Sequence, residues 1–368
     1  MSQMNVPCPH LVAGLMAAAV AFANATTWAE GPFDTLATFQ ATLSPSVLAR
    51  LETTPKHYRQ IEPSLYHLAA AHAARIGALS PEAQVDTLTK LARFIDARRA
   101  ATGGAVVIGP DRSVIGLLDP DRGLDPKEVE TISRAYGATP VIFKRTADTG
   151  TIEGVADAFL AAVSRAARTA TPTTIVILGH GLPEEIQSYS IPCSRLATAL
   201  LPAADAAAGT SVDLGHLVII CDDCYSADFS INLAATLERA CRERSLPLVS
   251  LPTMIAGTNR NCVGHADVGG KFVPHFWKDV IELFYIRRPR PAAITLRGFF
   301  ENVDSMMYGY GRASRVNGDG TVSYRLIDPD LCQDPVVFIS LGEDDLAALR
   351  QILDLPADAP LPRLFDIG

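Results

Sequence analysis

Hydrophobic residues recur along this chain with two different periods, and the change between them divides the sequence. From residue 33 to residue 100 they recur at helical spacing, as Leu88, Leu91 and Ile95 do. After residue 104, short uninterrupted apolar runs typical of buried strands alternate with helical patterns. We therefore predict a helical N-terminal module over residues 1–100, followed by an α/β region.

The α/β region contains strands and helices in alternation. The predicted strands are 105–108, 141–143, 174–179, 217–223, 248–256 and 336–339, and the predicted helices are 126–136, 152–168, 194–201, 230–243, 276–284 and 343–354. Connections of this kind join parallel strands through right-handed crossovers and place helices on both faces of the sheet. We predict a three-layer α/β fold with a mainly parallel central sheet over 104–300. The C-terminal extension, 301–368, is expected to complete or cover that sheet.

Composition narrows the class of protein. The chain has 368 residues, of which 48% are hydrophobic and 20% are charged, so it can form a large core. A net charge of −8 argues against a nucleic-acid partner, because phosphate binding needs clusters of Lys and Arg. No apolar run approaches a membrane span, and no glycine-rich loop precedes a helix in the manner of a nucleotide site.

The cysteines bear on the cellular compartment. Seven cysteines, an odd number, are scattered along the chain, which does not suggest a disulfide framework. We therefore expect a reducing, cytoplasmic location. Residues 11–25 favour the alternative of secretion, because they are apolar and end in Ala-Asn-Ala like a signal peptide. No Lys or Arg precedes them, however, and a buried alanine-rich helix would show the same pattern.

Two predicted strands end in residues that can carry chemistry. One apolar run leads into Gly179-His180-Gly181, and another leads into Cys221-Asp222-Asp223-Cys224. Open α/β sheets place their sites at such carboxyl ends. A thiol needs a base to become a nucleophile, and histidine is the usual base. We interpret Cys224 as a nucleophile and His180 as its acid/base partner, although either residue alone would be read as structural.

Backbone groups complete the expected site. The N–H groups of Gly181 and Cys224 could hold an oxyanion, and the glycine would let a substrate backbone come close. A helix that begins near Ser230 would add a weak positive potential behind Cys224.

The order of these motifs resembles the caspase, metacaspase, legumain, gingipain and separase group of cysteine peptidases. The signature of that group is an apolar strand ending in His-Gly, followed by an apolar strand ending in a nucleophilic Cys. The second block is similar to the metacaspase pattern Asp-x-Cys-x-Ser-Gly, with Asp222, Cys224 and Ser226 in place and Ala227 where Gly is usual. The stretch from Ala256 to Phe272 resembles the next strand, loop and Gly-Phe helix start. The resemblance covers about residues 104–285.

The resemblance implies a cysteine endopeptidase that hydrolyses a protein or peptide substrate with a His-Cys dyad and no cofactor. By residue it implies that Cys224 is the nucleophile, His180 the base or acid and Gly181 an oxyanion donor. Asp222 matches the acid that binds Arg or Lys before the cut, and Asp223 and Asp267 could add negative charge. These acids could equally be solvated or serve a helix end. Residues 300–335 are a plausible region for self-processing.

Other interpretations compete with the peptidase. Cys221-x-x-Cys224 followed by Cys262-x-x-His265 has the spacing of a four-ligand zinc site. Against it, residues 221 and 224 point to opposite faces if the strand continues through them. A thioredoxin-like redox pair is less favoured, because two acids between the sulfurs would raise the thiol pKa. A catalytically silent caspase-fold interaction protein is the remaining alternative.

Overall fold

The computed structural model describes residues 71–119, 126–146, 150–204, 209–258, 281–298 and 336–367, single residues 68, 206 and 277, and the backbone of 312–316 and 322–326. The signal-like segment 11–25, Cys262, His265, Asp267 and most of the proposed processing region lie outside the described residues. Among helices of the described part, none has both the length and the apolar character that crossing a bilayer requires.

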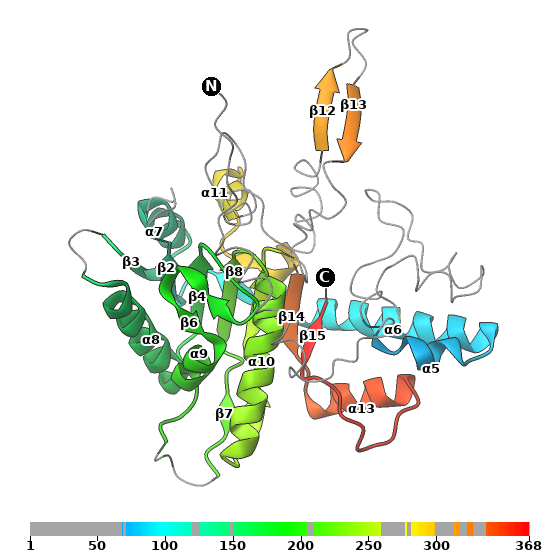
Figure 1. Ribbon diagram of the computed structural model, residues 1–368. Helices are drawn as coiled ribbons and strands as arrows, with labels where there is room; N and C mark the ends of the chain where they lie inside the picture. The colour runs from blue at the N-terminus through cyan, green and yellow to red at the C-terminus, as the bar shows by residue number, and fades with distance from the viewer. Residues whose placement is uncertain are drawn as a thin grey trace, which may run out of the picture.

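A seven-stranded sheet with the order β15-β14-β10-β8-β4-β2-β3 forms the centre of the protein (Figure 1). All neighbouring pairs from β3 to β10 are parallel, whereas β14 is antiparallel to both of its neighbours. The bounds are β2 Ser113–Leu118, β3 Thr139–Lys144, β4 Thr173–Leu178, β8 Leu217–Asp222, β10 Thr253–Ala256, β14 Val336–Ser340 and β15 Leu364–Asp366. The sheet is therefore large and mixed, and the predicted α/β class is confirmed.

Helices cover both faces of this sheet because its strands are apolar on both sides. On β4, Ile175 and Ile177 belong to one core cluster, and Val176 and Leu178 belong to another. The first cluster packs against α8, Ile152–Thr169, α9, Cys193–Leu200, and α10, Ser226–Glu243 (Figure 1). The second packs against α5, Ala73–Gly77, α6, Pro81–Thr102, α7, Pro126–Ala135, α11, Glu282–Ile286, and α13, Glu343–Ile352.

Helix α6 is the main described part of the region predicted as an N-terminal module. Ser80 caps it by accepting a hydrogen bond from the Ala83 N–H, as the Ser-Pro start predicts. Its buried residues, including Leu91 and Ile95, lie in the same core cluster as strand residues of the sheet. Helix α6 is thus packed onto the α/β layer structure, where its apolar face is removed from water.

The remaining described strands form small pairs beside the main sheet. β1, Val106–Ile108, pairs with β11, Ile294–Thr295, and β7, Val212–Asp213, pairs with β9, Leu248–Ser250. β5, Glu185–Ile186, and β6, Ile191–Pro192, flank the short helix η1, Gln187–Tyr189. β12, Arg312–Val316, and β13, Val322–Leu326, form the antiparallel pair that the turn chemistry after residue 316 predicts.

Several elements differ from the sequence prediction, and three of the differences bear on the sheet and the site. The predicted first strand, 105–108, lies outside the main sheet, and the true member is β2, which the prediction omits. Gly116 interrupts the apolar run of β2. A Cβ atom added there would lie 2.8 Å from Cδ1 of Ile142 on the neighbouring strand β3. The predicted strand 248–256 is split into β9 and β10, with Pro252 between them. Helix α10 begins at Ser226 rather than Ser230, so Cys224 lies closer to its start.

Candidate active site

The two candidate residues follow neighbouring strands of the sheet. β4 and β8 are paired in parallel, with Leu178 opposite Asp222 at their carboxyl ends. The ladder continues one step further, because the Gly179 N–H donates to the Asp222 carbonyl at 3.3 Å. His180 and Cys224 each stand two residues beyond the end of their strand. The loops that carry them therefore leave the same edge of the sheet side by side.

Gly181 brings the two loops into direct contact. A Cβ atom added at this buried glycine would lie 2.6 Å from the carbonyl oxygen of Cys224 and 2.5 Å from the Asp223 carboxyl. Real Cβ atoms do not come this close to other atoms, so a larger residue would force the loops apart. The His180-Gly181 loop is thus packed on the backbone of Cys224, and a glycine is required there.

Cys224 lies in a sharp turn between β8 and α10. Tyr225, the residue before the helix, has the left-handed values φ 58° and ψ 26°, which are unfavourable for a side chain of this size. The half-buried Cys224 therefore stands just ahead of an 18-residue helix, where the positive end of the dipole favours negative charge.

Thr258, just after β10, holds this turn in place. The Ser226 N–H donates to Thr258 Oγ1 and the Thr258 N–H donates to Ser226 Oγ, both at 2.9 Å. Thr258 Oγ1 also donates to the Asp223 carbonyl at 3.2 Å. All three residues are buried. The backbone on both sides of Cys224 is therefore fixed by a third strand end.

The His180 loop is held by residues that the sequence reasoning missed. The His180 N–H donates to Ser188 Oγ at 2.9 Å, and Ser188 Oγ donates to Asp119 Oδ2. On the other side, Asn232 of α10 donates to the Pro183 carbonyl at 2.8 Å. Asp119 follows the apolar run of β2 as Cys224 follows that of β8, and this signal could have identified it. No local pattern marks Ser188.

The predicted substrate-binding acids are in buried positions. Asp222 is 6% exposed, and its Oδ2 accepts the backbone N–H of Trp277 at 2.8 Å. Asp223 is 2% exposed, and neither of its carboxyl oxygens has a hydrogen-bond partner among the described residues. Burial and the neighbouring Asp222 raise the pKa of Asp223 well above its usual range. The raised pKa disfavours the charged form of Asp223, and burial keeps its carboxyl away from solvent.

Cys221, the other cysteine of the predicted Cys221-x-x-Cys224 pair, is more deeply buried than Cys224. Cys221 is 1% exposed and belongs to the core cluster that packs against α8, α9 and α10. Burial raises the pKa of its thiol well above the usual range. Within the described residues no group of three or more His, Cys, Asp and Glu side chains could hold a metal ion. The other two predicted zinc ligands, Cys262 and His265, are not among those residues.

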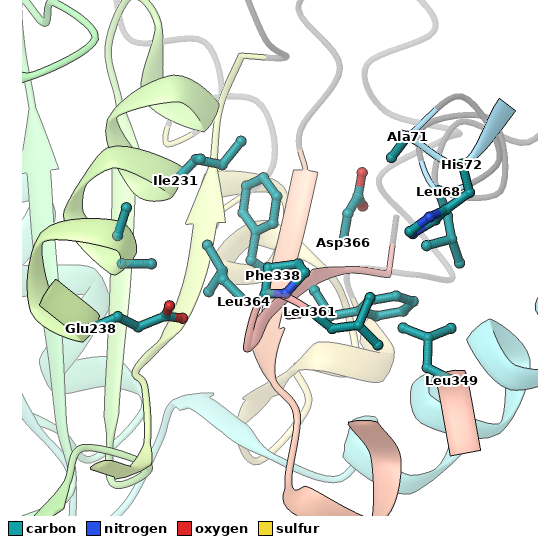
Figure 2. A pocket seen from close by; sticks show the side chains of 14 residues that line it. Leu68, Ala71, His72, Ile231, Glu238, Phe338, Leu349, Leu361, Leu364 and Asp366 are labelled. Carbon is teal, nitrogen blue, oxygen red and sulfur yellow. The ribbon is translucent and has the colours of Figure 1, made fainter. Parts of the chain in front are cut away.

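A wide apolar pocket lies away from the candidate site (Figure 2). Its walls come from α10, the edge strands β14 and β15, helix α13, and Leu68, Ala71 and His72. The charged or titratable groups at its lining are Glu238, His72 and Asp366, and none of the lining residues belongs to the His180 or Cys224 loops. Burial raises the pKa of Glu238 and lowers that of His72. The pocket therefore contains no nucleophile paired with a base.

The sequence matches no protein-family model, and no curated protein matches it. A functional assignment for this chain therefore depends on its own residues and on their arrangement in the fold.

Proposed function

We propose that this chain is a cysteine endopeptidase of the caspase-like class, with Cys224 as nucleophile and His180 as general base and acid. The observation that carries the proposal is the packing of Gly181 on the carbonyl oxygen of Cys224. It brings together a histidine and a cysteine from two strand ends that are 44 positions apart in the chain. The mainly parallel pairing and the helices on both faces agree with a caspase-like fold.

The chemistry would be acyl transfer followed by hydrolysis. The Cys224 thiolate attacks the carbonyl carbon of the scissile bond, while the N–H groups of Cys224 and Gly181 stabilise the oxyanion. His180 gives its proton to the leaving amine and then takes a proton from the water that hydrolyses the thioester. These steps use only side chains and backbone of this chain together with water.

The substrate would be a protein or peptide, with a basic residue before the cut. This preference is supported by the resemblance to the metacaspase pattern, in which Asp222 matches the acid two positions before the nucleophile. The Asp222 carboxyl is 6% exposed. Cleavage should be fastest for peptides ending in Arg or Lys and slower for those ending in Asp or Asn. Equal rates, or a preference for acidic residues, would exclude the basic preference while leaving the dyad intact.

We infer a cytoplasmic location from the thiols. The described cysteines, Cys193, Cys221, Cys224 and Cys241, are all free. A catalytic cysteine also functions best where the compartment keeps it reduced.

The decisive experiment is active-site labelling with a peptide acyloxymethyl ketone that ends in Arg. We expect labelling of the wild type and of Cys221→Ala, and none of Cys224→Ala or His180→Ala. The Cys221→Ala variant is the matched control, because it removes a thiol only three positions away in the chain. Bound zinc is measured on the same samples.

Three results would contradict the proposal. Labelling that survives in Cys224→Ala would place the nucleophile elsewhere. Absence of labelling together with about one zinc per chain would indicate the four-ligand site of Cys221, Cys224, Cys262 and His265. Absence of both labelling and zinc would favour a non-catalytic interaction protein.

A further inference from the structure

Ser188 contacts His180 through both backbone groups of that residue. Ser188 Oγ accepts the His180 N–H at 2.9 Å, and the Ser188 N–H donates to the His180 carbonyl at 3.3 Å. Ser188 belongs to η1, a single turn that folds back over the loop after His180. Ser188 therefore binds both the N–H and the carbonyl of His180. The residue as a whole is half-buried at the carboxyl edge of the sheet.

Asp119 fixes the orientation of the Ser188 hydroxyl. This carboxyl is 5% exposed and accepts the hydroxyl proton through Oδ2. A hydroxyl that donates to a carboxylate must use a lone pair toward its second partner, which here is the His180 N–H. Hydrogen bonds to ionised carboxylates are stronger than those between neutral groups. Asp119 thus makes Ser188 a better-defined acceptor than a freely rotating serine would be.

Asp119 is itself anchored at a third strand end. Its N–H donates to the Leu178 carbonyl at 2.8 Å, which extends the ladder between β2 and β4. Gly179 lies under the pair, and a Cβ atom there would be 2.8 Å from Ser188 Oγ and 2.9 Å from Asp119 Cβ. The lack of a side chain at residue 179 is what allows the carboxyl and the hydroxyl to reach the His180 backbone.

We propose that Asp119 and Ser188 are positioning residues, which hold the His180 loop so that its imidazole stays within reach of Cys224. This inference rests on the proposed peptidase function. Neither residue touches the reacting atoms, so their effect passes through the placement of His180. Displacement of a catalytic group by about 1 Å can cost about 100-fold in rate, so control of this backbone has large consequences.

The test is the rate of Cys224 alkylation by iodoacetamide between about pH 5.5 and pH 9.5, read by peptide mass spectrometry on the full chain. A free thiol reacts with a pKa of about 8.5, and a nearby imidazolium extends its reactivity to lower pH. We expect Ser188→Ala to slow alkylation at about pH 6 by roughly tenfold, and to leave the rate at about pH 9.5 within about twofold. Asp119→Ala should act in the same direction.

Three comparisons separate positioning from a general structural role. Ser188→Thr keeps the hydroxyl and should restore the wild-type profile. Ser133→Ala is the control, because it removes another serine hydroxyl, which is more deeply buried than that of Ser188 and donates to the Val129 carbonyl on α7. His180→Ala should give the same profile as Ser188→Ala. The variants at Ser188 and Ser133 retain the titratable groups around the two loops, which include Asp119, Glu184, Glu185, Asp222, Asp223, Tyr225 and Asp228.

The outcomes distinguish the two proposals. If His180→Ala slows alkylation at low pH and Ser188→Ala behaves like Ser133→Ala, the positioning role is wrong and the dyad remains. If His180→Ala has the wild-type profile, no dyad operates, and the peptidase proposal fails together with the positioning role. Amide hydrogen exchange at His180 supplies a readout without catalysis: unchanged exchange in Ser188→Ala would also overturn the inference.

Discussion

The amino ends and the carboxyl ends of the parallel strands form two opposite edges of the sheet. Their polar groups differ in how far they are satisfied by hydrogen bonds. At the amino edge, Arg112 precedes β2 and donates to the Thr173 carbonyl at 2.9 Å and to the His216 carbonyl at 3.1 Å. Its Nε donates to Thr174 Oγ1 at 2.9 Å. One cation therefore satisfies acceptors at the starts of two neighbouring strands, β4 and β8. This arrangement contributes to stability and contains no nucleophile.

The carboxyl edge of the same strands differs in carrying an unsatisfied buried group. Left-handed backbone occurs at both edges, at Tyr225 on the carboxyl side and at Asp111 and Ala170 on the amino side. The Asp223 carboxyl has no hydrogen-bond partner among the described residues. Such features reduce stability and persist where the surrounding structure enforces them, often at functional sites. The comparison teaches that one sheet can place stabilising contacts at its amino edge and reactive groups at its carboxyl edge. Variants at each edge test this separation.

The largest effect is expected from Gly181→Ala at the carboxyl edge. The new methyl group would collide with the Cys224 carbonyl and the Asp223 carboxyl, so the two loops must separate. We expect labelling by the Arg-ended ketone to fall by about 100-fold or more, while the far-UV circular dichroism of the fold is retained.

Gly116→Ala is the control for this substitution. Its new Cβ would meet mainly the far end of the Ile142 side chain, at 2.8 Å from Cδ1, and that end can move. Labelling should therefore stay within about threefold of wild type. Equal loss of labelling in both variants would mean that any glycine substitution in this sheet is damaging.

Arg112→Ala at the amino edge should have the next largest effect, and on stability rather than labelling. It would remove one donor from each of two carbonyls and from a threonine hydroxyl, although the His216 carbonyl keeps the Thr173 N–H. The expected cost is about 2–3 kcal/mol in the free energy of unfolding. Burial lowers the pKa of Arg112 to about 10, so the residue is still charged at neutral pH. Urea unfolding measures the loss.

The rate of labelling of folded Arg112→Ala protein should equal that of the wild type. A large fall in labelling under conditions where the variant remains folded would contradict the separation of the two edges.

Asp223→Asn should give a smaller effect that depends on pH. A carboxyl whose pKa is raised in the folded state binds its proton more tightly there than in the unfolded chain. The folded state therefore loses stability as pH rises above the unfolded value of about 3.9, by at most about 1.4 kcal/mol per pH unit. Asparagine does not titrate in this range. The melting temperature of the variant minus that of the wild type should therefore increase from about pH 5 to pH 8.

Asp213→Asn provides a control with the opposite sign. Hydrogen bonds from Ser250 and from the Gly215 N–H lower the pKa of this exposed carboxyl, so it stabilises the fold above its unfolded pKa. The variant should be slightly less stable than wild type, by a constant amount between about pH 5 and pH 8. A constant difference for Asp223→Asn as well would show that Asp223 is ionised in the folded protein.

The sequence predicted much of the α/β architecture and both candidate residues, for an identifiable reason. A strand buried on two faces must be apolar throughout, so β4 and β8 and the residues that end them could be located directly. The β2 strand was missed because Gly116 interrupts its apolar run. The start of α10 was misplaced because Ser226, Ala227 and Asp228 carry no clear helical period.

The sequence by itself determined most of the strands and helices of the α/β region, and that His180 and Cys224 each follow an apolar strand. These properties are local, since they depend on the period of hydrophobic residues and on turn chemistry. Only the tertiary structure decided that β4 and β8 are neighbours, that Gly181 packs on Cys224, and that Asp223 is buried with a raised pKa. It also brought Asp119 to Ser188 across 69 positions of chain. Such contacts depend on which segments pack together in three dimensions, and no local pattern of residues specifies that choice.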